Sequence, residues 1–146
     1  MRFETVLFET RDRVAHVRLN RPERLNAISR QTIADVGKIL DEIEADDGVA
    51  VVVLSGAGRA FSSGMDLKDD AAADISGEDA WRRILSEDLN FIMRFWDCPK
   101  PTIAVAHGFC LAAACELAMA CDMTIAEVGT YFGEPELKFG SVITAM

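Results

Sequence analysis

The chain has 146 residues, about the length of one domain, and half of them are hydrophobic while 27% are charged. These values are ordinary for a globular protein, and they exclude a disordered, collagen-like or coiled-coil chain. The 24 acidic residues outnumber the 15 basic ones, which gives a formal net charge of −9. Because an acidic protein repels phosphate backbones, we expect no nucleic-acid partner.

The sequence also lacks the signals of a membrane protein or a zinc protein. No apolar run reaches the length that spans a bilayer, and Arg2 and Glu4 interrupt the start where a signal peptide would lie. We therefore expect no membrane partner. Four cysteines without a C-x-x-C pair indicate reduced thiols, a cytoplasmic location and no metal site: Cys98, Cys110, Cys115 and Cys121.

The first half of the chain predicts a hairpin, a helix and a buried strand. Apolar-rich stretches over 3–9 and 14–19 flank a polar turn, which is typical of a β-hairpin. Ser29 can cap a helix that runs to about Glu44. The β-branched run over 49–54 suits a strand buried on both faces in a parallel sheet.

The second half predicts an alternation of helices and strands. A loop over 56–68 and a patternless, mobile stretch over 71–77 come first. A capping box of Ser76 and Asp79 then starts a helix over 78–96. Strands over 102–106 and 123–126 flank a helix over 111–120, and such alternation indicates one parallel, right-handed α/β domain.

Two segments resemble familiar functional motifs but do not match them. The Gly-rich segment that begins at Gly56 lacks the third glycine of a dinucleotide-binding loop, because Phe61 occupies that position. Ser62-Ser63-Gly64 is not a G-x-S-x-G elbow and has no histidine nearby in the sequence, which disfavours a nucleophilic serine.

Glu116 is the strongest candidate for chemistry. Every other residue over 109–121 is apolar, and a helix that is apolar all round is buried. Burial penalises the charged form of a carboxyl group, which is how such a group becomes a general acid or base near neutral pH. Alternatively, Glu116 pairs with an arginine or reaches the surface of the domain.

Two further features are candidates for the same site as this glutamate. Ala112-Ala113-Ala114 opens the helix with small side chains, which leaves its first N–H groups accessible to an anionic oxygen. The helix propensity of alanine explains the triplet equally well. Glu134-Pro135-Glu136 supplies a second carboxylate on a turn, which is either simply solvated or flanks one substrate together with Glu116.

Five segments in register over nearly the whole chain resemble the crotonase (enoyl-CoA hydratase/isomerase) family: 20–27 (NRPERLNA), 58–67 (GRAFSSGMDL), 100–108 (KPTIAVAHG), 112–122 (AAACELAMACD) and 132–137 (FGEPEL). The resemblance implies an α/β fold, the crotonase-like ββα superhelix with mostly parallel strands. It also implies an enzyme that binds acyl-CoA thioesters, with coenzyme A as part of the substrate and no further cofactor.

The same resemblance implies roles for individual residues. The backbone N–H groups of Met65 and Ala113 fall on the pair that holds the thioester oxygen, and Glu116 and Glu136 fall on the two catalytic glutamates. Two glutamates favour hydration of 2-enoyl-CoA to 3-hydroxyacyl-CoA through an enolate. An isomerase, another thioester-enolate enzyme or a non-catalytic acyl-CoA-binding homologue remain as alternatives.

Further residues are expected along the coenzyme A path: Ala27, Ser63, Met65, Asp66, Leu67, Lys68 and Ala113. Lys68 either meets a phosphate or is solvated. His107 stands where the family frequently has asparagine, and we expect it to bond nearby backbone. The family often has glycines where this helix opens with alanines, which fit if their φ angles are negative.

The resemblance also bears on the length of the chain. Family members continue past the second glutamate into helices that close the acyl pocket and build trimers. Residues 1–146 are therefore expected to form the N-terminal catalytic core without the C-terminal helical region, with an exposed apolar surface. A homotrimer or a dimer of trimers is expected of the full-length form.

Overall fold

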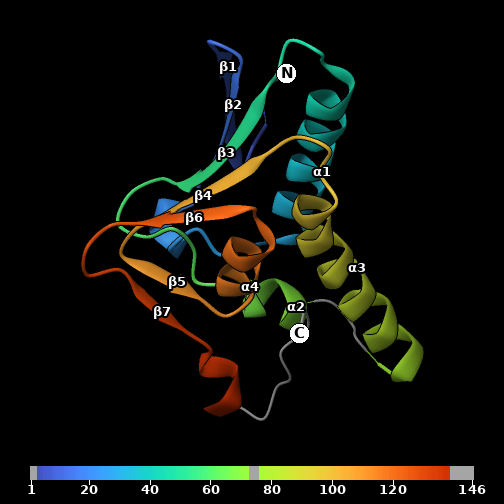
Figure 1. Ribbon diagram of the computed structural model, residues 1–146. Helices are drawn as coiled ribbons and strands as arrows, with labels where there is room; N and C mark the ends of the chain where they lie inside the picture. Colours follow the sequence, from blue (N-terminus) through green and yellow to red (C-terminus); the bar gives the residue numbers. More distant parts are fainter. Residues whose placement is uncertain (1–2, 73–75, 139–146) are drawn as a thin grey trace.

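The computed structural model describes residues 3–72 and 76–138 and is built on a five-stranded sheet (Figure 1). The strand order is β1-β2-β3-β4-β6, and only the β1–β2 pair is antiparallel. The strands are β1 (Val6–Arg11), β2 (Val14–Leu19), β3 (Val51–Gly56), β4 (Thr102–Ala106) and β6 (Met123–Ala126). The predicted hairpin and the mostly parallel α/β sheet are both confirmed.

Helix α1 (Arg30–Ala45) lies against β1 and β2, and helix α3 (Glu78–Trp96) lies beside α1 (Figure 1). The predicted cap of α1 is confirmed, because Ser29 Oγ accepts a hydrogen bond of 3.2 Å from the N–H of Thr32. The predicted capping box of α3 is wrong. Gly77 occupies the N-cap with φ +87°, a conformation that glycine adopts without strain, and no side chain caps the helix.

Three short elements differ from the sequence-based expectation. β5 (Phe109–Leu111) and β7 (Tyr131–Gly133) form a separate parallel pair, and α2 (Leu67–Ala72) begins within the predicted loop. The helix expected from residue 111 begins as α4 (Ala113–Ala120). Of the stretch 71–77 that was predicted to be mobile, residues 73–75 lie outside the described residues.

The remaining elements are two short 3₁₀ helices, η1 (Pro22–Arg24) and η2 (Pro135–Lys138). Among the helices that the structure describes, none is long and apolar enough to cross a membrane. Large apolar side chains are exposed in α4, β5, β6 and β7 and the adjoining loop, in line with the expected apolar surface: Phe109, Met119, Met123, Ile125, Val128, Tyr131 and Phe132.

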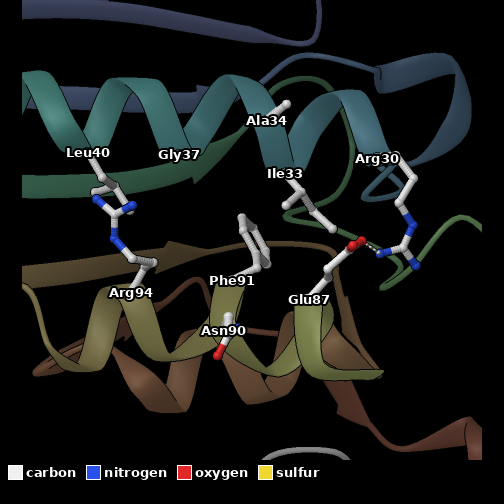
Figure 2. Close-up of a pocket in the computed structure, with 9 residues that line it drawn as sticks. All are labelled: Arg30, Ile33, Ala34, Gly37, Leu40, Glu87, Asn90, Phe91 and Arg94. Atoms are coloured by element: carbon white, nitrogen blue, oxygen red, sulfur yellow. Dashed lines mark ion pairs between the residues drawn. The ribbon is translucent and has the colours of Figure 1, made fainter. Parts of the chain in front are cut away.

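A groove of about 410 Å³ runs between α1 and α3 (Figure 2). Ile33 and Phe91 contribute apolar lining, and Arg30 at one end is 3.8 Å from the carboxylate of Glu87. The groove stays open at Gly37, because a Cβ at this position would meet nothing within 4 Å. None of its lining residues belongs to the site that the sequence predicts.

Gly37→Ala should stabilise the protein by about 0.5–1 kcal/mol, because alanine loses less backbone entropy in a helix and the added methyl group meets no neighbour. Urea unfolding would measure this change. Ala34→Gly, at an exposed position of the same helix, is the matched control and should shift the free energy of unfolding by a similar amount in the opposite direction. A destabilised Gly37→Ala variant would contradict the prediction.

Candidate active site

Three parallel segments bring the predicted site residues to one edge of the small sheet. β5 pairs with β7 on one side, and on the other a bridge joins Cys110 to Ser62. Ser62 donates its N–H to the carbonyl of Phe109 and accepts from the N–H of Leu111, each at 3.1 Å. Because parallel strands end at the same edge, the chain continues there into Met65, Ala113 and Glu136.

The N–H of Met65 is aimed by its two neighbours. Ile28 donates its N–H to the carbonyl of Gly64 at 2.8 Å and accepts from the N–H of Asp66 at 2.9 Å. In a planar trans peptide the C=O and N–H point in opposite directions. The Met65 N–H, which shares its peptide plane with the Gly64 carbonyl, therefore points away from Ile28. Within residues 3–72 and 76–138 it has no acceptor.

The N–H of Ala113 is the first of helix α4. The carbonyl of Ala112 accepts helical hydrogen bonds from Cys115 at 2.7 Å and Glu116 at 3.3 Å. The same peptide geometry then directs the Ala113 N–H out of the helix N-terminus, where the helix dipole favours negative charge. The described part of the chain offers this N–H no acceptor either.

Gly64 is the contact between these two donor segments. Its φ is +92°, and a Cβ there would lie 2.6 Å from the Cβ of Ala112 and 3.3 Å from the nitrogen of Ala113. Real Cβ atoms essentially never approach another atom as closely as 2.6 Å. The absence of a side chain at position 64 therefore lets the loop that carries Met65 reach the start of α4.

Ala112 adopts a backbone conformation that is unusual for alanine. Its φ is +57° and its ψ is −137°, so the condition of a negative φ, under which alanine fits easily, is not met at this residue, whereas Ala113 and Ala114 are helical. A conformation of this kind costs about 1–3 kcal/mol for a residue with a Cβ. The neighbourhood holds it in place, since its N–H donates to the carbonyl of Gly133 at 2.8 Å.

Glu116 lies one helical turn after the Ala113 donor, and only 4% of its surface is exposed. The predicted burial is confirmed, and a surface position is excluded. Glu136 belongs to η2, and the bond from Ala112 to Gly133 holds the preceding strand against the start of α4. The side chain of Glu136 lies outside the described part of the structure, so its predicted role stays a prediction.

Asp66 anchors the loop next to the Met65 donor. Its buried carboxylate forms ion pairs with Arg21 at 2.9 Å and Arg24 at 3.4 Å, and it accepts from the N–H of Lys68 at 3.2 Å. Burial alone would raise the pKa of Asp66, but the hydrogen bonds from Arg21 and Lys68 and the two arginine charges hold it below its ordinary value. The carboxylate is thus engaged within the protein.

The other residues predicted along the coenzyme A path surround this anchor. Leu67 and Lys68 are exposed in α2, Ser63 is half-buried and Ala27 is buried. Their contacts with a ligand remain predictions.

His107 and Cys110 have structural surroundings. The Nε2 atom of His107 lies 2.9 Å from the carbonyl of Gly58, so the expected bond to nearby backbone is confirmed. Cys110 is fully buried, and burial is the main cause that raises the pKa of its thiol to about 12. A thiol of that pKa is a poor nucleophile near neutral pH.

Gly64→Ala should destabilise the protein by more than about 2 kcal/mol and abolish ligand binding at the site, because the new methyl group would overlap Ala112. Gly129→Ala is the matched control. Gly129 has φ +90°, but a Cβ there would meet nothing within 4 Å, so this variant carries the backbone strain without the overlap. Equal losses in the two variants would contradict the proposed contact.

Ala112→Gly should raise the free energy of unfolding by about 1 kcal/mol, because release of backbone strain outweighs the entropy that glycine loses on folding. Thermal unfolding would measure the gain. The Ala34→Gly variant, in ordinary helical backbone, should show a loss instead. A destabilised Ala112→Gly protein would mean that its backbone is not strained in solution.

Comparison with known proteins supports the same interpretation of the chain. A sequence model described as enoyl-CoA hydratase/isomerase matches residues 9–146. A probable enoyl-CoA hydratase of Rhizobium meliloti is 37% identical over 142 residues, which are 97% of this chain and 53% of that protein. The short-chain-enoyl-CoA hydratase of Clostridium acetobutylicum is 35% identical over 149 aligned residues, covering 96% and 53% of the two chains.

A solved structure agrees in fold. The enoyl-CoA hydratase/isomerase of Xanthobacter autotrophicus Py2 superposes with a TM-score of 0.95 and 53% sequence identity, over 98% of this chain and 53% of that one. The chain thus spans about half the length of the relatives it matches. The match of the family over residues 9–146, together with this fold, leads to one conclusion: the chain belongs to the enoyl-CoA hydratase/isomerase family.

Proposed function

We propose that the protein hydrates 2-enoyl-CoA thioesters to 3-hydroxyacyl-CoA. The observation that carries the proposal is the pair of backbone N–H groups at Met65 and Ala113. Neither has an acceptor within the described residues, and the segments that carry them touch at Gly64. Such a pair of donors suits an oxygen on which negative charge develops during reaction.

In the proposed reaction the thioester oxygen of the substrate accepts from these two N–H groups. Attack of water on C3 moves the electrons of the C2–C3 double bond toward the carbonyl, and the thioester oxygen becomes an enolate oxygen. Fixed donors stabilise that charge, and removal of one comparable donor in other enzymes slows reaction by about 10²–10³-fold. Backbone donors need no particular side chain at positions 65 and 113.

Glu116 and Glu136 are proposed to move the protons. One carboxylate takes a proton from water while the water oxygen bonds to C3, and the other carboxyl group delivers a proton to C2. The sum is addition of one water molecule across the double bond, with no redox step and no cofactor beyond the coenzyme A of the substrate. The position of Glu116 in α4 supports its part, because its buried carboxyl group lies one helical turn after the Ala113 donor.

The coenzyme A moiety is proposed to follow the loop from Ser63 to Lys68 and to pass Ala27. Its phosphates are anionic, and a protein of net charge −9 attracts them only where local donors outweigh the overall field. Lys68 supplies a positive charge at an exposed position in α2. The carboxylate of Asp66 contributes by holding this loop through its pairs with Arg21 and Arg24.

The proposed setting is a cytoplasmic homotrimer or dimer of trimers formed by the full-length protein. The exposed apolar side chains of β6 and β7 support contacts beyond these residues, within the full-length chain or between its copies, because exposed apolar patches mark interaction surfaces. Four free cysteines support a reducing compartment.

Glu116→Gln should lower kcat for crotonyl-CoA hydration by more than about 100-fold while the affinity for acyl-CoA changes little, because the amide keeps the shape but cannot exchange protons. Glu136→Gln should behave alike. Loss of absorbance of the enoyl thioester would follow the rate, and calorimetry would follow binding. Glu44→Gln, on the remote helix α1, is the control and should keep wild-type rates.

The product distinguishes hydration from isomerisation. In ¹⁸O-labelled water, hydration places one labelled oxygen on C3, whereas isomerisation of the double bond incorporates none. Unlabelled product would replace the proposed reaction with isomerisation. Binding of acyl-CoA without turnover of any enoyl-CoA chain length would replace it with a non-catalytic role.

A further inference from the structure

Ser62 is a buried polar residue that has no role in the steps of the proposed reaction. It lies in the segment that pairs with β5, and none of its surface is exposed. Its hydroxyl makes two hydrogen bonds. Oγ donates to the backbone carbonyl of Asn26 at 2.8 Å and accepts from the N–H of Gly64 at 3.2 Å. The hydroxyl therefore connects a fixed carbonyl to the residue that precedes the Met65 donor.

The carbonyl of Asn26 is well anchored. Only 1% of Asn26 is exposed, and its side-chain amide donates to the carbonyls of Ala57 and Ala60, each at 2.8 Å. Its Oδ1 accepts from the N–H of Arg21 at 2.9 Å. The two amide bonds tie Asn26 to the distant loop at residues 57–60, and the bond from Arg21 ties it to its own segment, so this residue is held from both sides.

Gly64 is held at both of its backbone polar groups. Ser62 Oγ fixes its N–H, and the N–H of Ile28 fixes its carbonyl at 2.8 Å. These two bonds limit rotation about φ and ψ of a glycine, which has no side chain of its own to restrict it. The Gly64 carbonyl and the Met65 N–H share one peptide plane, so the direction of the donor depends on both bonds.

We propose that Ser62 is a positioning residue for the Met65 N–H in the proposed hydration. The inference rests on the proposed function, since it assigns Ser62 a share in orienting one of the two donors to the thioester oxygen. Loss of the hydroxyl leaves the N–H of Gly64 without its bond and lets the Gly64–Met65 peptide rotate. Rotation weakens the hydrogen bond to the enolate more than it weakens binding of the coenzyme A moiety.

Ser62→Ala should therefore lower kcat for crotonyl-CoA hydration by about 10–100-fold, because a donor displaced by a fraction of an ångström loses much of its effect on the transition state. KM should stay within about threefold of the wild-type value, since the lost interaction belongs to the transition state. Ser62→Cys keeps a weak donor and acceptor at the same place and should give an intermediate kcat.

Thr102→Val is the matched control for loss of a buried hydroxyl. Thr102 is 1% exposed, and its Oγ1 donates to the carboxylate of Asp122 at 2.9 Å and accepts from the N–H of the same residue at 3.0 Å. The two hydroxyls have similar bonding. Thr102, however, lies at the start of β4, and its hydroxyl bonds to Asp122 and not to a residue next to either donor. Thr102→Val should lower the melting temperature and leave kcat unchanged.

A second readout does not depend on turnover. The chain has six methionines, so selective ¹⁵N-methionine labelling gives few amide signals, and Met65→Leu assigns the signal of Met65. Butyryl-CoA, which has no double bond to hydrate, should shift this signal in the wild type. In Ser62→Ala the same saturating addition should produce a smaller shift, while in Thr102→Val the shift should match the wild type.

The outcomes separate the two proposals. A wild-type protein that shifts the Met65 signal but does not hydrate crotonyl-CoA overturns the proposed reaction, and a reduced shift in Ser62→Ala would still support the positioning role. A Ser62→Ala protein with wild-type kcat and shift overturns that role. Equal losses of kcat in Ser62→Ala and Thr102→Val also overturn it, because they would reflect general stability. Should Ser62→Ala fail to fold, wild-type kcat and shift in Ser62→Cys would overturn it.

Discussion

A side chain at position 64 would occupy the space of the Ala112 methyl group, and the loop that carries Met65 reaches helix α4 only because glycine stands there. The close approach lies between the two donors, one residue from each. Everything else around the site supports this contact. The bonds of Ile28 hold the loop from one side, and the pairing of β5 with β7 holds the start of α4 from the other.

The position of Ala112 between β5 and α4 explains its strained backbone. Helix α4 begins directly after β5, and Ala112 is the single residue that joins the two elements. A cost of about 1–3 kcal/mol for that residue is offset by burial of the helix and by the bond from Ala112 to Gly133. Asp66 shows a similar balance, since its buried charge is tolerated because two arginines and a backbone N–H surround it.

The long periodic elements could be predicted from the sequence, because their signals are local. Helix α3 has the predicted bounds, and the strands at 102–106 and 123–126 were likewise found. β5 and β7 could not be predicted, since three residues are too few for a period and their pairing joins distant segments. The burial of Glu116 followed from its apolar neighbours. The close contact of Gly64 did not follow from any local pattern, although a glycine beside an expected backbone donor was a usable signal.

The connections of the small parallel sheet also affect how the protein folds. Ser62, Cys110 and Phe132 lie in register there although long stretches of chain separate them, so this sheet forms only after large loops have closed. Helices α1 and α3 are local and can form much earlier. A chain that had formed α1 and α3 but not this sheet would have most of the native helix content and still lack both donors. Ligand binding at this edge is a stricter test of correct folding than circular dichroism of the helices.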